Sequence, residues 1–254
     1  MPQAPVCYTH FMERGIPHAS SLIERLVGLE ADVRYRQLAS AGEPEFLHVP
    51  GSVPVLLSAP HGATHTRDGE EKEEDEYTAG MARLVAELAD AHAIVARRRS
   101  RTDPNADPQA PYRHLLRSVV EAFEIDFVLD LHGVREERAF AVALGTMDGE
   151  SCPRQEDLIV ETFEAYGFGR EMGPADRLVV NDPRFTGGVS QDTITRFVSQ
   201  DLGVPAAQVE LHEACRIVKR FKDAHLATSF HGDRGRIERV IRACVAVVEG
   251  VNQG

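Results

Sequence analysis

Two patterns of hydrophobic and polar residues alternate along the chain. Short apolar runs, several of which end at proline, glycine or histidine, predict strands. These runs are Val33–Leu38, Glu45–Val49, Val53–Ala59, Ala93–Ala96, Asp126–Leu131, Ala139–Leu144, Leu178–Val180 and Ala206–Leu211. The first two alternate polar and apolar residues, which is typical of edge strands.

Other segments repeat their apolar residues every three or four positions, which predicts helices. These segments are Ala19–Val27, Glu73–Ala91, Tyr112–Phe123, Gln155–Tyr166, Val189–Leu202 and Gly235–Val248. Gly203 is expected to end the helix that precedes it. Strands that alternate with helices predict an α/β fold with a largely parallel sheet and both faces covered. Ligands of such sheets bind at the carboxyl ends of the strands.

The composition is that of one globular domain. The chain has 254 residues, of which 43% are hydrophobic, so a single core can hold it. We expect one domain over residues 1–254, in which residues 1–50 form an N-terminal extension that packs on the core. The four cysteines, Cys7, Cys152, Cys215 and Cys244, are far apart, which indicates free thiols in a reducing cytoplasm.

Charge and hydropathy narrow the possible partners. The net charge of −12 argues against nucleic-acid binding, because an acidic surface repels phosphate backbones. A buried pocket can still bind an anion, because its own side chains determine the local charge. No apolar stretch approaches the ~18–20 residues that span a bilayer. These features argue against nucleic-acid and membrane partners, and the oligomeric state stays open.

Three predicted strands end in residues that can bind metal or move protons. His61 follows the strand at 53–59, His132 follows the strand at 126–131, and Glu210 lies near the end of the strand at 206–211. Neutral imidazole is a common zinc ligand, and a glycine directly after each histidine allows a tight turn. The pattern predicts a metal site, with solvent-facing turn histidines as the alternative. Most of the other histidines, His65 among them, are expected to lie outside this site.

An acidic run offers candidates for a third metal ligand. Acidic residues occupy most positions from 68 to 76, where the helix Glu73–Ala91 is expected to begin, and the helix dipole favours a carboxylate in its first turn. A catalytic zinc needs three protein ligands and one open position.

Glu210 is the candidate general base, with an ion pair to Arg216 or Arg220 as the alternative.

A second polar patch lies in the loop from Arg97 to Arg113. It holds five arginines together with Asp103 and Asn105, in a chain that is acidic as a whole. A planar arginine fork can bind a substrate carboxylate. The sequence contains no G-x-G-x-x-G, Walker or G-x-S-x-G motif, so it predicts neither a phosphate-binding loop nor a serine nucleophile elbow.

Seven short motifs follow one another between about Val55 and Ile217. They are Ser58-Ala59-Pro60-His61-Gly62, Glu74-Asp75-Glu76-Tyr77-Thr78, Arg99 to Asn105, Asp130-Leu131-His132-Gly133, Gly145 to Cys152, Phe185-Thr186-Gly187-Gly188, and Gln208-Val209-Glu210. In this order they resemble the N-formylglutamate amidohydrolase family, whose members are zinc-dependent amide hydrolases. The resemblance implies an α/β fold of one three-layer domain, with a mostly parallel mixed sheet flanked by helices. This fold is phosphorylase/hydrolase-like and zinc-exopeptidase-like.

The same resemblance implies a metal centre. One Zn²⁺ per chain would be bound by His61, Asp75 and His132, with Glu74 as the alternative to Asp75. Glu210 would be the general base.

The resemblance further implies residues that bind substrate. Asn105 and Arg113 would hold the substrate's carboxylate or polarise its carbonyl, and Arg99 is a further candidate. The chain departs from the family pattern at Ala106, where arginine is usual, and Arg113 or Arg99 is expected to compensate. Asp130 is expected either to support the metal ligands or to point away from them.

The function implied is a zinc-dependent amidohydrolase. It would cleave the N-formyl or N-acyl amide bond of a small carboxylate-bearing amino-acid derivative such as N-formylglutamate. The alternative is a non-catalytic ligand- or metal-binding domain on the same scaffold. Glu210 argues against that alternative, because a binding domain needs no base. A metallophosphoesterase would need more ligands for two metals than the sequence offers.

Overall fold

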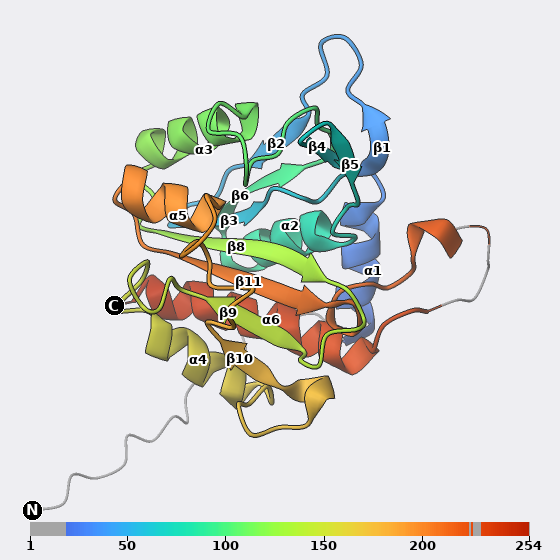
Figure 1. The fold of residues 1–254 in the computed structure, drawn as a ribbon. Helices are drawn as coiled ribbons and strands as arrows, with labels where there is room; N and C mark the ends of the chain where they lie inside the picture. Colours follow the sequence, from blue (N-terminus) through green and yellow to red (C-terminus); the bar gives the residue numbers. More distant parts are fainter. Residues whose placement is uncertain (1–18, 224, 226–229, 254) are drawn as a thin grey trace, which may run out of the picture.

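A mixed sheet runs through the centre of the molecule, which the computed structural model describes over residues 19–223, 225 and 230–253 (Figure 1). Within these residues the sheet has seven strands. Their order is β10 (Leu178–Val180), β9 (Val142–Gly145), β11 (Ala206–His212), β8 (Phe127–Val134), β3 (Val53–Ala59), β6 (Ala91–Ala96) and β2 (Phe46–Val49). Strands β11, β8, β3 and β6 are parallel, whereas β2 and β9 run antiparallel to their partners β6 and β11.

Helices cover both faces of the sheet, so the domain has three layers (Figure 1). One face packs against α1 (Ala19–Glu30), α2 (Thr78–Ala89), α4 (Glu156–Ala165) and α6 (Arg234–Val251). The other packs against α3 (Pro111–Ala122) and α5 (Ile194–Arg196), which continues as the π-helical turn Phe197–Asp201. The expected fold class, a single α/β domain with a largely parallel sheet covered on both faces, is therefore confirmed.

Smaller elements surround this core. Strand β1 (Arg34–Leu38) pairs with β7 (Arg98–Arg99), and β4 (His65–Arg67) forms a hairpin with β5 (Glu70–Lys72). Short 3₁₀ turns occupy Pro174–Asp176, Glu213–Cys215 and Phe221–Asp223. The sequence pattern did not predict the β4–β5 hairpin, because its strands are only three residues long and mostly polar.

The expected helix Glu73–Ala91 was wrong at both ends. Helix α2 begins only at Thr78, because Tyr77 adopts the left-handed conformation with φ 70° and cannot continue a helical turn. Asp90 is also left-handed, with φ 53°, and turns the chain into β6 at Ala91. The acidic run therefore forms a strand and a loop before the helix, and Asp75 does not lie in a first helical turn.

The expected helix Val189–Leu202 was also too long. Residues 189–192 form a loop, and the helix begins after Thr193, whose hydroxyl accepts a hydrogen bond from the Arg196 amide. Its end is as expected, since Gly203 has φ 70°. The shorter helix leaves the segment before Thr193 free to line the cleft described below.

The remaining expectations concern the N-terminal residues, the cysteines and membrane-spanning segments. Residues 1–18, which include Cys7, lie outside the described residues, whereas α1 packs against α2 and α6. Cys152, Cys215 and Cys244 are buried free thiols. No helix in residues 19–223, 225 and 230–253 is both long and apolar enough to cross a membrane.

Candidate metal centre and active site

The candidate site is built on two neighbouring parallel strands, β8 and β11. Their register places Glu210 beside His132 and Gln208 beside Asp130. Side chains two residues apart on a strand point to the same face, so all four project from the face that α3 and α5 cover. Their exposed fractions lie between 0% and 7%. These four buried polar side chains therefore lie together near the carboxyl ends of the two strands.

His61 reaches the same site from the turn after β3. The Gly62 that follows it packs directly on α2: a Cβ atom there would come within 2.7 Å of the Ala79 Cβ and 2.8 Å of the Ala96 carbonyl oxygen. Only glycine lets the backbone pass this closely. The glycine after His61 therefore fixes the corner that presents the imidazole.

The loop before α2 brings Asp75 to the histidines. The Asp75 amide donates to the His61 carbonyl oxygen at 2.8 Å, and the Asp75 carbonyl oxygen accepts from the Thr78 amide and hydroxyl. These backbone contacts hold Asp75 against the His61 corner. Tertiary contact, rather than a helix dipole, thus positions the carboxylate.

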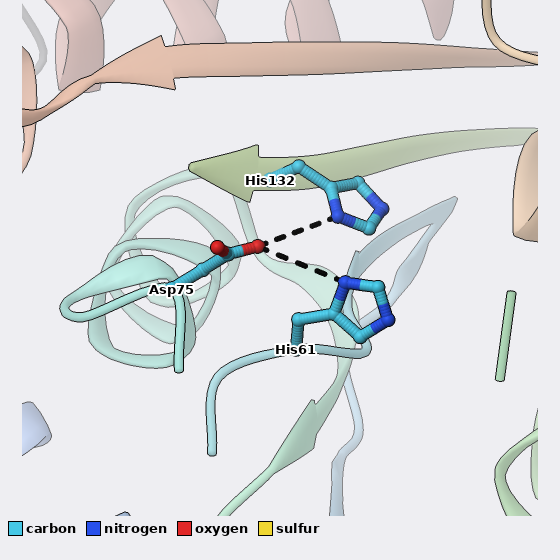
Figure 2. A group of neighbouring side chains, drawn as sticks. All are labelled: His61, Asp75 and His132. Atoms are coloured by element: carbon cyan, nitrogen blue, oxygen red, sulfur yellow. Dashed lines mark ion pairs between the residues drawn. The ribbon is translucent and has the colours of Figure 1, made fainter. Parts of the chain in front are cut away.

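Three potential ligand atoms converge between these elements (Figure 2). The Asp75 Oδ2 atom lies 3.8 Å from the His61 Nδ1 atom and 3.4 Å from the His132 Nδ1 atom. Ligands of a tetrahedral zinc ion at about 2.0–2.2 Å stand roughly 3.3–3.6 Å apart. Two imidazoles and one carboxylate, with carboxylate–nitrogen distances close to this spacing, fit a zinc ion and leave one coordination position open.

A carboxylate supports each histidine from behind. The His61 Nε2 atom lies 3.0 Å from the Asp103 Oδ1 atom, and the His132 Nε2 atom lies 3.0 Å from the Asp130 Oδ2 atom. A proton on each Nε2 would be donated to these carboxylates and leave the Nδ1 lone pair facing Asp75. Asp130 therefore supports His132. The two side chains lie on the same face because they are two residues apart on strand β8.

The two histidines have opposite pKa shifts. Burial, reinforced by the neighbouring His65 and His132, lowers the pKa of His61 to about 4. Burial also acts against a charge on His132, yet the carboxylates of Asp130, Asp75 and Glu210 raise its pKa well above the usual value. This excess of carboxylates favours a positive charge at the centre, which a metal ion would supply.

Glu210 stands beside this centre and forms no ion pair with any other residue that the structure describes. Its Oε1 atom accepts a hydrogen bond from the Gln208 Nε2 atom at 2.6 Å, and burial raises the Glu210 pKa to about 7. The alternative of an ion pair with Arg216 or Arg220 was wrong, because both arginines bind elsewhere. Arg216 donates to the carbonyl oxygens of Leu211 and Glu76, and Arg220 pairs with Glu213 and Glu76.

These groups line a cleft of about 320 Å³. His61, Asp75, His132 and Glu210 all face it, and so does Asn105. The Asn105 Oδ1 atom accepts a hydrogen bond from the Ile194 amide, so its Nδ2 group is left to donate into the cleft. The structure therefore brings together five of the seven residues that the sequence singled out.

The structure does not bring Arg113 and Arg99 to this cleft. Arg113 is 2% exposed and donates to the Pro104 carbonyl oxygen and to the carboxylate and carbonyl of Asp192. Arg99 pairs with Glu71 at 2.9 Å. Both arginines tie loops together, so they do not take the place of the arginine that is absent at position 106.

The fold adds several groups that the sequence did not assign to the site, and the expectation that His65 lies outside it was wrong. Asp103 accepts from His61 and from Arg67, and the ring of His65 stacks on that of His61 with centroids 4.0 Å apart. Other arginines, at positions 67, 135, 138 and 184, line the cleft. Their one sequence signal is position, since three of them lie three to six residues after His61 or His132 and Arg184 lies directly before the Phe185-Thr186-Gly187-Gly188 motif.

Comparison with known proteins supports the fold. No family model and no curated protein matches the chain. The solved structure of N-formylglutamate amidohydrolase from Ralstonia eutropha JMP134 matches with a TM-score of 0.57 and 14% identity, over 83% of this chain and 99% of that one. A putative carboxypeptidase A from Shewanella denitrificans OS-217 matches with a TM-score of 0.51 and 14% identity, over 91% of this chain and 69% of that one. The fold that the sequence resemblance implied is therefore the fold of this chain.

Proposed function

We propose that the chain is a zinc-dependent amidohydrolase that removes an N-formyl or N-acyl group from a small carboxylate-bearing amino-acid derivative such as N-formylglutamate. One observation carries this proposal. One ligand atom from each of His61, Asp75 and His132 lies within 4.8 Å of the other two, beside the Glu210 carboxylate, which accepts a hydrogen bond from Gln208. This combines a metal-binding donor set with a general base.

The role of Glu210 follows from its surroundings. A metal ion held by His61, Asp75 and His132 would polarise the amide carbonyl and make a water molecule more acidic. With a pKa of about 7, Glu210 can accept a proton from the attacking water and return it to the leaving amine nitrogen. Gln208 holds one oxygen of the carboxylate, so the other is available for this transfer.

The cleft supports a small substrate. Its volume of about 320 Å³ is at the lower end of ligand pockets, which favours a molecule of the size of one amino-acid derivative. Asn105 can donate a hydrogen bond to the amide carbonyl as negative charge develops on its oxygen. The arginines that line the cleft favour a substrate with a carboxylate.

The first test is metal content together with turnover. Elemental analysis of the purified protein is expected to find about one zinc per chain in the wild type and none in His132→Ala. His114→Ala, which changes an exposed histidine on α3, is the matched control and is expected to keep its zinc. The zinc-loaded wild type is then assayed for the release of formate or acetate from N-formyl and N-acetyl amino acids.

The outcomes separate the competing functions. Zinc that is lost only in His132→Ala, together with turnover, supports the amidohydrolase. Bound zinc without turnover of any acyl amino acid favours the non-catalytic binding domain. A wild type that holds no zinc even after zinc is added contradicts the proposed mechanism at its first step.

A further inference from the structure

The arginines of the cleft differ in what their guanidinium groups already contact. Among the described residues that line the cleft, four are arginines, and three of these pair with a carboxylate. The pairs are Arg67 with Asp103, Arg135 with Glu73, and Arg184 with Asp182. Within the described part of the chain, Arg138 has no carboxylate at ion-pair distance, so its N–H groups are available to a ligand. Its charge acts on Asp182 from a longer distance and helps to lower the pKa of that carboxyl.

Arg138 is nevertheless held in place. Its Cζ atom lies 5.3 Å from the centroid of the Phe185 ring, and that ring packs edge-on against Phe140 with centroids 5.5 Å apart. Phe185 belongs to a small apolar cluster with Val134 and Phe140 and also lines the cleft. A guanidinium held over a fixed ring is restricted in its motion, and its N–H groups can still donate to a planar anion.

The charges of the cleft are distributed unevenly. The carboxylates of Asp75, Asp130 and Glu210 surround the candidate metal centre, and they would repel the carboxylate of a substrate there. Arg138 lies on the same cleft, where the turn after β8 leads away from His132. A substrate that places its amide carbonyl at the candidate metal centre avoids this repulsion if its own carboxylate lies at Arg138 instead.

We propose that Arg138 binds the substrate's carboxylate and is the residue that makes the enzyme specific for an acidic substrate. This inference rests on the proposed function and adds the residue on which its specificity depends. Arg184 contributes to the same wall, but Asp182 already occupies its guanidinium through two contacts of 3.0 and 3.2 Å. Arg138 is thus the arginine with a free fork for a carboxylate.

The test compares an acid with its amides. We would measure kcat/KM of the zinc-loaded wild type and of Arg138→Ala for N-formylglutamate, for its α-carboxamide and for its γ-carboxamide. Loss of a charge-assisted hydrogen-bonded pair is expected to lower kcat/KM for the acid by about 10- to 100-fold. One of the two amides is expected to be a poor substrate of the wild type and to be unaffected by Arg138→Ala, which identifies the carboxylate that Arg138 binds.

Two further variants control this experiment. Arg117→Ala removes an arginine that stacks on Phe197 at 5.3 Å outside the cleft, and it is expected to leave every kcat/KM unchanged. Arg138→Lys keeps a charge without the fork and is expected to recover part of the loss. An equal loss for the acid and both amides in Arg138→Ala, or no loss at all, would overturn the proposal.

Binding of glutarate keeps this proposal separate from the proposed function. Calorimetry with the zinc-loaded full chain is expected to show a Kd for glutarate that is at least about tenfold higher in Arg138→Ala than in the wild type. If the wild type hydrolyses none of the compounds but shows this difference, the amidohydrolase fails and the anion site at Arg138 stands. Glutarate that binds both proteins equally, or fails to bind the wild type, overturns the Arg138 assignment.

Discussion

The two faces of strands β8 and β11 differ in polarity although both are buried. On one face, Leu129, Leu131 and Val209 are completely buried in the main hydrophobic core against α2 and α6. On the other face, the intervening residues Asp130 and His132, together with Glu210, are almost as deeply buried but polar. Successive residues of one strand thus serve packing and candidate chemistry in turn.

The polar face places hydrogen-bonding atoms in the interior of the protein, which the apolar face does not. Among the described residues, neither the Asp130 Oδ1 atom nor the Gln208 Oε1 atom has a hydrogen-bond partner, although both are buried. Buried polar atoms without partners destabilise a fold, so this face lowers stability. The opposite face offsets that loss by packing hydrophobic side chains, which makes a rigid base for the site.

Two buried glutamates show the same contrast between a structural role and candidate chemistry. Burial raises the pKa of both Glu30 and Glu210 to about 7. Glu30 uses both carboxylate oxygens, because it accepts hydrogen bonds from the Tyr35 hydroxyl and from the Tyr77 and Gly80 amides at the start of α2. Glu210 accepts from Gln208 with one oxygen. Glu30, which accepts hydrogen bonds with both oxygens, holds the start of α2. Glu210 keeps one oxygen available for proton transfer.

Replacement of Glu210 by glutamine is expected to have the largest effect. Glutamine keeps the shape but cannot accept the proton, so kcat should fall by about 10²- to 10⁴-fold while zinc content and thermal stability stay close to wild type. Steady-state assays with elemental analysis test this. Near wild-type turnover in this variant would remove Glu210 from the mechanism.

Replacement of Leu131 by alanine tests the apolar face beside the same metal ligand. The cavity left by this fully buried side chain is expected to lower the free energy of unfolding by about 2–5 kcal/mol, with zinc affinity unchanged in the folded protein. Urea denaturation measures the first quantity and zinc titration the second. Leu38→Ala, at a position that is 44% exposed, is the matched control and should change stability little. Loss of zinc affinity in folded Leu131→Ala would show that the two faces are not independent.

Replacement of Glu30 by glutamine tests the structural glutamate through pH. A carboxyl whose pKa is raised from 4.5 to about 7 on folding favours the folded state when protonated, and this stabilisation is lost as the pH rises from about 4.5 to about 7. The free energy of unfolding of the wild type relative to Glu30→Gln should therefore fall by up to ~3 kcal/mol over this range. Denaturation at several pH values measures it, with Glu24→Gln on the same helix as control. A difference that does not change with pH would contradict the assigned environment of Glu30.

Replacement of Asp130 by asparagine is expected to have the smallest effect. It weakens the contact behind His132 without removing a metal ligand, so zinc affinity should fall by about 10- to 100-fold. Competition with a chromogenic chelator measures this affinity. Asp126→Asn, which changes an exposed residue next to the start of β8, is expected to leave it unchanged. Equal affinities for all three proteins would mean that Asp130 does not support His132.

Most of the fold could be predicted from local patterns, and its errors have local causes. Strands β3 and β10 have the bounds that were expected, because continuous apolar runs between turn residues leave no competing structure. The bounds of the helices expected at Glu73 and Val189 failed where left-handed residues or side-chain caps override the apolar period, as at Tyr77 and Thr193. The three-residue strands of the β4–β5 hairpin are too short for any period to show.

The sequence by itself determined the α/β layers and the residues His61, His132 and Glu210 at the ends of apolar strands, because strand period and turn residues are local properties. Only the tertiary structure decided that Asp75 faces the two histidines, that Asp103 and Asp130 support them, and that Arg138 rather than Arg99 or Arg113 faces the cleft. These contacts join residues from different loops and strands. Their geometry depends on how the strands pair and the helices pack, which no local pattern specifies.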